Sequence, residues 1–195
     1  MDLLSKHEVF EMKILNQLNS GRILEKMVFG GGTMLRLCHE LNRYSADLDF
    51  WLIVPVDAEP FLNNIIALLN RDYEITDSKI KHYSILVEVR SNKYPKKLKI
   101  EIRKEIRLWD METKIAYSKE SNRQVFLKTH TLAQSMANKI EALIDRGEIR
   151  DAFDMEFLLR KGIKIPELSD LKRISMKKRI DSFRESDYKV KLGST

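Results

Sequence analysis

Residues 31–50 read GGTMLRLCHELNRYSADLDF, and this stretch decides the fold class. Two glycines open a segment with helical spacing of apolar residues, and an apolar strand that carries Asp47 and Asp49 follows. Glycines let backbone N–H groups approach a phosphate at a helix N-terminus. Because Asp47 and Asp49 alternate with Leu48 and Phe50, both carboxylates point to one side of the strand. This order is typical of metal-dependent nucleotidyl transfer, in which carboxylates hold two Mg²⁺ ions and the metals hold a triphosphate.

The composition excludes several classes of protein. With 195 residues, 43% of them hydrophobic, the chain is long enough for one compact domain or two small lobes that share a core. No apolar run approaches a membrane span, and the first residues do not resemble a signal peptide. The single cysteine, Cys38, allows no internal disulfide, and we interpret it as core filler. We therefore expect a cytoplasmic protein with no membrane partner.

Other catalytic classes lack their motifs. The four histidines are scattered without zinc-site spacing, and no GxSxG motif of a serine hydrolase is present. The net charge of +6 is modest but compatible with a polyanionic partner. Residues 171–195 hold eight Lys/Arg against three acidic residues, which fits either a solvated helix face or a nucleic-acid patch. That patch would contain Lys172, Arg173, Lys177, Lys178 and Arg179.

The chain changes character near residue 128. Before this point the pattern predicts helices over residues 7–18, 33–41 and 57–69, and strands over 27–29, 47–54, 73–78, 83–90, 98–103 and 124–128. After it, a capping box at Thr131 opens a helix over 132–146, which Gly147 ends. A helix over 150–160 follows, and Pro166 opens a further short helical region. We therefore predict an α/β (α+β) fold, with a mixed-sheet catalytic lobe over 1–128 and a helical lobe over 129–195.

A third carboxylate is expected beside the aspartate pair, because two metal ions usually need a ligand from a neighbouring strand. Glu101 alternates with Ile100 and Ile102, so it faces away from the apolar side of its strand. Glu88 is the rival candidate, in a similar strand. We favour Asp47, Asp49 and Glu101 as the metal ligands.

Two stretches of the chain resemble the AbiEii/AbiGii toxin family of nucleotidyltransferases, within the DNA polymerase β-like superfamily. The first comprises Gly31, Gly32, Thr33, Leu35, Arg43, Ser45, Asp47, Leu48, Asp49 and Phe50. The second comprises Lys139, Ile140, Ala142, Leu143, Arg146, Arg150, Asp151, Asp154 and residues 157–159. The two motifs stand in the family's order and cover most of residues 25–160.

The resemblance implies roles for these residues. The catalytic set would be Asp47, Asp49, Lys139 and Asp151, and the nucleotide-binding set Gly31, Gly32, Thr33, Arg36, Arg43, Ser45 and Lys139. Arg36 enters because members often carry a lysine before the glycines, where this chain has Val28, Phe29 and Gly30.

Two roles stay open at this level. Arg43 either binds a carboxylate or phosphate of the site, or braces Asp47 from outside it. Asp151 either orients Lys139 or assists deprotonation of the acceptor, whereas we interpret Asp154 as structural.

The resemblance further implies a toxin of a toxin–antitoxin or abortive-infection system, with an antitoxin encoded nearby that need not contact it. The reaction would move a nucleoside monophosphate from an NTP to a nucleic acid, foremost the 3′ end of tRNA. Two alternatives stay open: transfer to a protein or a small molecule such as an aminoglycoside, and a non-catalytic regulatory protein with a decayed site.

Overall fold

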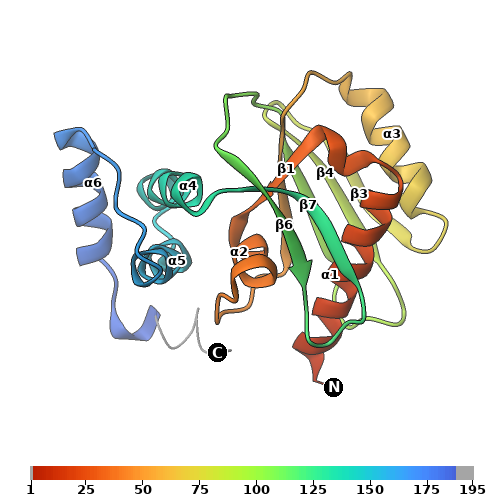
Figure 1. The fold of residues 1–195 in the computed structure, drawn as a ribbon, viewed down its shortest axis with the longest axis horizontal. Coiled ribbons are helices and arrows are strands. Elements are labelled where there is room, and N and C mark those ends of the chain that lie inside the picture. The colour runs from red at the N-terminus through yellow and green to blue at the C-terminus, as the bar shows by residue number, and fades with distance from the viewer. Residues whose placement is uncertain (1, 188–195) are drawn as a thin grey trace.

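A computed structural model of the chain describes residues 2–187 (Figure 1). Within this range the centre is a seven-stranded mixed sheet in the order β3-β4-β5-β2-β1-β7-β6. The strands are β1 (Met27–Gly30), β2 (Asp47–Leu52), β3 (Glu74–Ile80), β4 (Ser84–Arg90), β5 (Leu98–Arg103), β6 (Met111–Tyr117) and β7 (Gln124–His130). The helices are α1 (Leu3–Ser20), α2 (Gly31–His39), α3 (Ala58–Leu69), α4 (Leu132–Arg146), α5 (Ile149–Arg160) and α6 (Asp170–Asp181), with a 3-10 helix, η1 (Ile23–Lys26), before β1. The predicted fold class is confirmed.

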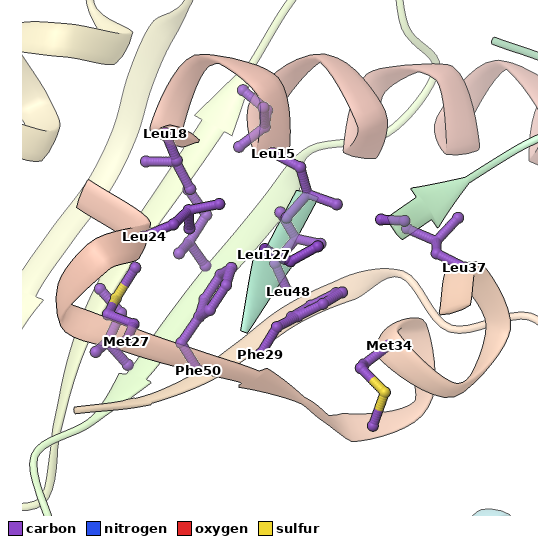
Figure 2. Close-up of a cluster of buried hydrophobic side chains, with 14 of the residues drawn as sticks. Leu15, Leu18, Leu24, Met27, Phe29, Met34, Leu37, Leu48, Phe50 and Leu127 are labelled. Atoms are coloured by element: carbon purple, nitrogen blue, oxygen red, sulfur yellow. The ribbon is translucent and has the colours of Figure 1, made fainter. Parts of the chain in front are cut away.

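One face of the sheet packs against α1 and α3. In α1 the buried side chains recur at helical spacing, as with Phe10, Ile14 and Leu18, each 0% exposed. Figure 2 shows Phe50 of β2 reaching toward Leu15 and Leu18 of α1. Burying a side chain of this size stabilises the fold by roughly 1.5–3 kcal/mol. This packing fixes β2 so that its alternate residues face the other side of the sheet.

The strand β2 lies at the centre of the site described below. It pairs antiparallel with β1, where Gly30 lies opposite Asp49, and parallel with β5, where Asp49 lies opposite Glu101. The pairing therefore joins the glycine turn, the aspartate pair and the predicted third carboxylate on one small region of the sheet.

The helical lobe begins as its capping residues predict. The Thr131 hydroxyl accepts a hydrogen bond from the Gln134 N–H at 3.1 Å, and Gly147 ends α4 with φ of +65°. In Figure 1, α4, α5 and α6 stand beside the sheet on the side away from α3. Buried residues of α4 and α5 belong to the same hydrophobic core as the strands, so the two predicted lobes share one core.

Two elements differ from the sequence prediction. The strand β6 was not predicted, since its side chains Met111, Ile115 and Tyr117 are 40%, 51% and 52% exposed and only Ala116 is buried. In this edge strand the large apolar side chains lie on the exposed face, and Glu112 and Lys114 lie on the face that packs, so the sequence shows no apolar face. The last helix does not begin at Pro166 but at Asp170, where the Ser169 hydroxyl accepts from the Lys172 N–H at 3.4 Å. Residues 188–195 of the predicted basic segment lie outside the described residues.

Candidate active site

The glycine turn touches the aspartate strand so closely that side chains there are excluded. Gly31 has φ of +74°, and a Cβ at this position would lie 2.4 Å from Asp49 Oδ2. A Cβ on Gly32 would lie 2.5 Å from Arg43 Nη2 and 2.9 Å from Ser45 Oγ. No side chain caps the start of α2, so its first N–H groups are available to an anion. The turn thus brings an anion-binding helix end directly to Asp49.

The predicted carboxylates lie together on the open face of the sheet. Asp47 and Asp49 share one side of β2, and Glu101 is the register partner of Asp49 on β5. Lys99 Nζ lies 2.9 Å from Asp47 Oδ2 and 3.8 Å from Glu101 Oε2. The rival residue, Glu88, forms an ion pair with Lys97 at 2.7 Å on β4. The register therefore favours Glu101 over Glu88 as the companion of Asp49.

Asp49 lies close to the two other carboxylates, Asp47 and Glu101. Burial raises the pKa of its carboxyl, and the neighbouring negative charges of Asp47 and Glu101 raise it further, while Lys139 and Arg103 oppose them. A bound cation would offset the energetic cost of burying the charged carboxylate and would reduce its repulsion from Asp47 and Glu101.

A buried ionic network surrounds Lys139 of α4. Its Nζ lies 2.6 Å from Asp154 Oδ2 and 3.2 Å from Asp151 Oδ1. Arg43 donates from Nε and Nη2 to the two oxygens of Asp154, both at 2.7 Å. Arg146 donates to Asp151 at 2.8 and 2.7 Å. Within this network three cations therefore share two carboxylates.

The network settles how Asp151 is paired. Burial by itself raises the pKa of Asp151, but the hydrogen bond from Arg146 and the charges of Lys139 and Arg146 outweigh it, so the pKa is lowered. A carboxylate held charged in this way suits the orientation of Lys139 better than proton abstraction. Asp154 contacts Lys139 as closely as Asp151 does, so the predicted division between a functional Asp151 and a structural Asp154 finds no basis in the contacts.

Three predicted nucleotide-binding residues are held by contacts with other parts of the chain. Arg36 points toward α1, where it forms buried ion pairs with Glu8 and Glu11. Thr33 is buried, and its hydroxyl donates to the Asp47 carbonyl at 2.6 Å. Arg43 is occupied by Asp154 and does not brace Asp47. Arg36 is thus paired with acids of α1, and its expected role in compensating for the missing lysine before the glycines stays a prediction.

Gly31, Asp49 and Lys139 meet in a cleft of about 460 Å³ between the open face of the sheet and α4. Sequence reasoning missed much of its lining, which includes Trp51, Arg103, Glu105, Arg107, Trp109, Ser135, Asn138, Glu141 and Asp145. Trp51 and Arg103 continue the alternation that places Asp49 and Glu101 on the open face, so the strand period was a usable signal for them.

The carboxylates fit a divalent cation by their chemistry. Within residues 2–187 no three His, Cys, Asp or Glu side chains are already gathered as a metal cage. The three oxygen donors are nevertheless of the type that Mg²⁺ prefers, and the Lys99 ammonium already lies between Asp47 and Glu101. The donor set therefore accepts positive charge at this position.

The sequence profile of the family described as nucleotidyl transferase AbiEii toxin, type IV toxin–antitoxin system, matches residues 13–191. The chain belongs to this family. It is therefore a nucleotidyltransferase of the toxin type, as the two motifs predicted.

Solved structures share the fold of this AbiEii-family toxin. JHP933 from Helicobacter pylori aligns with a TM-score of 0.52 at 21% identity, over 76% of this chain and 64% of that one, so this chain spans less than two thirds of its length. A putative nucleotidyltransferase from H. pylori aligns with a TM-score of 0.53 at 20% identity, over 78% and 68%. MenT4, a nucleotidyltransferase toxin from Mycobacterium tuberculosis H37Rv, aligns with a TM-score of 0.51 at 16% identity, over 93% and 88%.

Two further searches found nothing. No curated protein matches the chain. Among residues 2–187, no helix combines the length and the apolar character that crossing a membrane requires.

Proposed function

We propose that this toxin transfers a nucleoside monophosphate from an NTP to the 3′ end of tRNA in a metal-dependent reaction. The observation that carries the proposal is the meeting of the α2 N-terminus, Asp49 and the buried Lys139 in one cleft. The uncapped N-terminus of α2 and the Lys139 ammonium attract a triphosphate. The Asp49 carboxylate would repel the triphosphate unless a metal ion lies between them.

The chemistry requires positioning more than covalent participation by the protein. The acceptor hydroxyl oxygen forms a bond to the α-phosphorus, and the bond from that phosphorus to the β-phosphate oxygen breaks. Pyrophosphate leaves, and the hydroxyl proton passes to a carboxylate of the cleft or to water. Lys139 and the first N–H groups of α2 would hold the triphosphate, so that the α-phosphorus lies near Asp49.

Asp47, Asp49 and Glu101 would hold the divalent cations. When bound, these neutralise the phosphates and stabilise the attacking and leaving oxygens. Glu101→Gln should therefore weaken Mn²⁺ binding, measured by titration of the purified protein, whereas Glu88→Gln should not. Weaker Mn²⁺ binding in Glu88→Gln but not in Glu101→Gln would assign Glu88 rather than Glu101 to the proposed metal site.

The proposed RNA surface lies on α6, which docks on α4. Lys172 pairs with Glu141, and Arg179 donates to the Ile144 carbonyl at 3.2 Å and the Asp145 carbonyl at 3.3 Å. Lys172 and Arg179 therefore help to hold α6 against α4. The exposed Arg173, Lys177 and Lys178 are left as the better candidates for phosphate contacts.

The acceptor class is tested by incubating the purified toxin with each α-³²P-labelled NTP, Mg²⁺ and a total cell extract. We expect label in RNA of tRNA size, removable by ribonuclease. Label that resists ribonuclease and is removed by protease, or that stays in the small-molecule fraction, would contradict the proposed acceptor. The antitoxin, encoded nearby, is proposed to oppose this activity without a requirement for direct contact.

A further inference from the structure

The cleft continues beyond the carboxylates into an aromatic half. Trp51 follows Asp49 on the same side of β2, and its register partner on β5 is Arg103. One step of two residues along a strand is roughly 7 Å, so this pair lies next to the reacting region. The Arg103 guanidinium lies 5.5 Å from the centre of the Trp51 ring, and Arg107 lies 5.3 Å from that of Trp109. Each indole thus has a guanidinium beside it, and aromatic rings and guanidinium planes are both groups that contact nucleic-acid bases face to face.

The two indoles are rigidly held. Trp51 contacts Trp109 edge to face at 6.2 Å between ring centres and His130 at 4.7 Å. A Cβ on Gly30 would lie 2.5 Å from the Trp51 ring, so the strand has no side chain beneath the indole. Trp109 is 7% exposed, and its Nε1 donates to the Leu52 carbonyl at 3.4 Å. A stacking surface fixed in this way loses little side-chain freedom when a ligand binds.

The facing wall, on α4, offers polar groups at helical spacing with Lys139. Ser135 is 4% exposed and lines the cleft, yet its Oγ has no hydrogen-bond partner in the described part of the chain. Burying a hydroxyl without a partner is unfavourable, so rotation of the Ser135 side chain toward a ligand in the cleft would gain a hydrogen bond. Asn138 lines the cleft as well. Its Oδ1 accepts from Gln134 Nε2 at 3.0 Å, and its Nδ2 donates to His130 Nδ1 at 3.1 Å.

We propose that the Trp51–Arg103 end of the cleft is the nucleobase subsite for the incoming NTP, with the base stacked on Trp51 and its polar edge read by Ser135. This inference rests on the proposed nucleotidyl transfer and names where its substrate's base binds. The phosphate end, with Gly31 and Lys139, and the aromatic end belong to one continuous cleft. Its volume of about 460 Å³ falls within the range of roughly 300–1,000 Å³ of small-molecule sites.

Binding without turnover tests the subsite. The affinities of each NTP and of inorganic tripolyphosphate, which lacks a base, are measured by calorimetry for the wild type, Trp51→Ala and Trp51→Phe. We expect Trp51→Ala to weaken the best NTP by about tenfold, the scale of one base–aromatic stack, while tripolyphosphate changes by less than about twofold. Trp51→Phe should retain most of the NTP affinity. Tyr83→Ala, an exposed aromatic in the β3–β4 connection, is the matched control and should change neither.

Ser135→Ala supplies a second readout. Removing a buried hydroxyl that lacks a partner should raise the melting temperature of the free protein and still weaken the binding of at least one NTP. A purely structural Ser135 would lower the melting temperature and leave NTP binding unchanged.

The outcomes separate this inference from the proposed function. Equal loss of NTP and tripolyphosphate affinity in Trp51→Ala, or unchanged NTP binding with weakened RNA binding, would overturn the base subsite even if the enzyme transfers nucleotides. The expected loss confined to NTP would support the subsite even if no acceptor RNA were ever labelled.

Discussion

Lys139 is a buried cation that two carboxylates hold in place. Its ammonium lies between Asp151 and Asp154, and each of those carboxylates is also held by an arginine. Burial of a charged group is tolerated only when it is paired, as it is here. The same ammonium lines the cleft, where it suits a triphosphate.

Lys139→Ala should therefore separate nucleotide binding from acceptor binding. Asp151 and Asp154 remain paired with Arg146 and Arg43, so the protein should still fold. Loss of one charge-assisted contact should weaken NTP binding by about tenfold or more. RNA affinity, measured separately by filter binding, should stay near the wild-type value, as should both affinities in the control Lys128→Ala. Collapse of RNA affinity with intact NTP affinity would refute the assignment.

Asp49→Asn should abolish transfer and leave the protein as stable or more stable. Because burial, Asp47 and Glu101 raise the pKa of Asp49, its charged form destabilises the folded state at neutral pH. The gain in the free energy of unfolding should shrink as the pH falls through that raised pKa and vanish below the ordinary value of 3.8. Urea unfolding from pH 7 to pH 3.5 measures it, with Asp170→Asn, at an exposed position in α6, as control. A variant less stable than wild type at pH 7 would contradict this electrostatic account.

At the scale of elements, α2 and β2 act as one unit because the Gly31 turn lies against Asp49. Gly31→Ala should lose transfer activity and roughly 1–3 kcal/mol of stability, since φ of +74° is strained for alanine and the new Cβ displaces the carboxylate. Gly162→Ala is the matched control, because its φ is +83° and nothing lies within 4 Å of the new Cβ. It should lose stability from backbone strain alone and keep full activity. Equal activity of the two variants would show that the close approach at Gly31 is unimportant.

Elements whose apolar residues recur at the helix or strand period were predictable, and β6 was not. The strand β2 is recognisable because Leu48 and Phe50 are fully buried and the polar Asp47 and Asp49 that alternate with them are only partly buried, whereas β6 at the sheet edge has no such contrast. Site residues that lie on the regular alternation of a strand, such as Asp49 and Glu101, could be predicted in the same way. The ion pairs of Arg36 could not, because its partners Glu8 and Glu11 come from another helix, and no local pattern reveals that contact.

At the scale of the whole molecule, α6 stands in the helical lobe beside α4 and α5 (Figure 1). It carries the basic residues Arg173, Lys177 and Lys178, and α4 lines the cleft. If α6 binds the phosphate backbone of RNA, replacing Arg173, Lys177 and Lys178 together by alanine should lower RNA affinity. The dependence of log K on log[salt] should flatten by roughly one unit per lost contact. Filter binding from low to moderate salt measures both.

A charge-matched control distinguishes this surface from general electrostatics. Replacing the exposed Lys6, Lys81 and Lys119 removes the same charge from the sheet lobe. That variant should keep most of the RNA affinity. An equal loss in both triple variants would mean that net charge alone, and not α6, attracts the RNA.

The central claim is nucleotidyl transfer to an RNA 3′ end within the cleft that holds Asp49, and one labelling measurement tests it most directly. The toxin is incubated with Mg²⁺, tRNA and an NTP labelled at either the α- or the γ-phosphate, with Asp49→Asn and periodate-oxidised tRNA as controls. We predict that α-label enters intact tRNA, that γ-label is released as pyrophosphate, and that both controls stay unlabelled. Incorporation of γ-label, or of α-label into oxidised tRNA or by Asp49→Asn, would contradict the account.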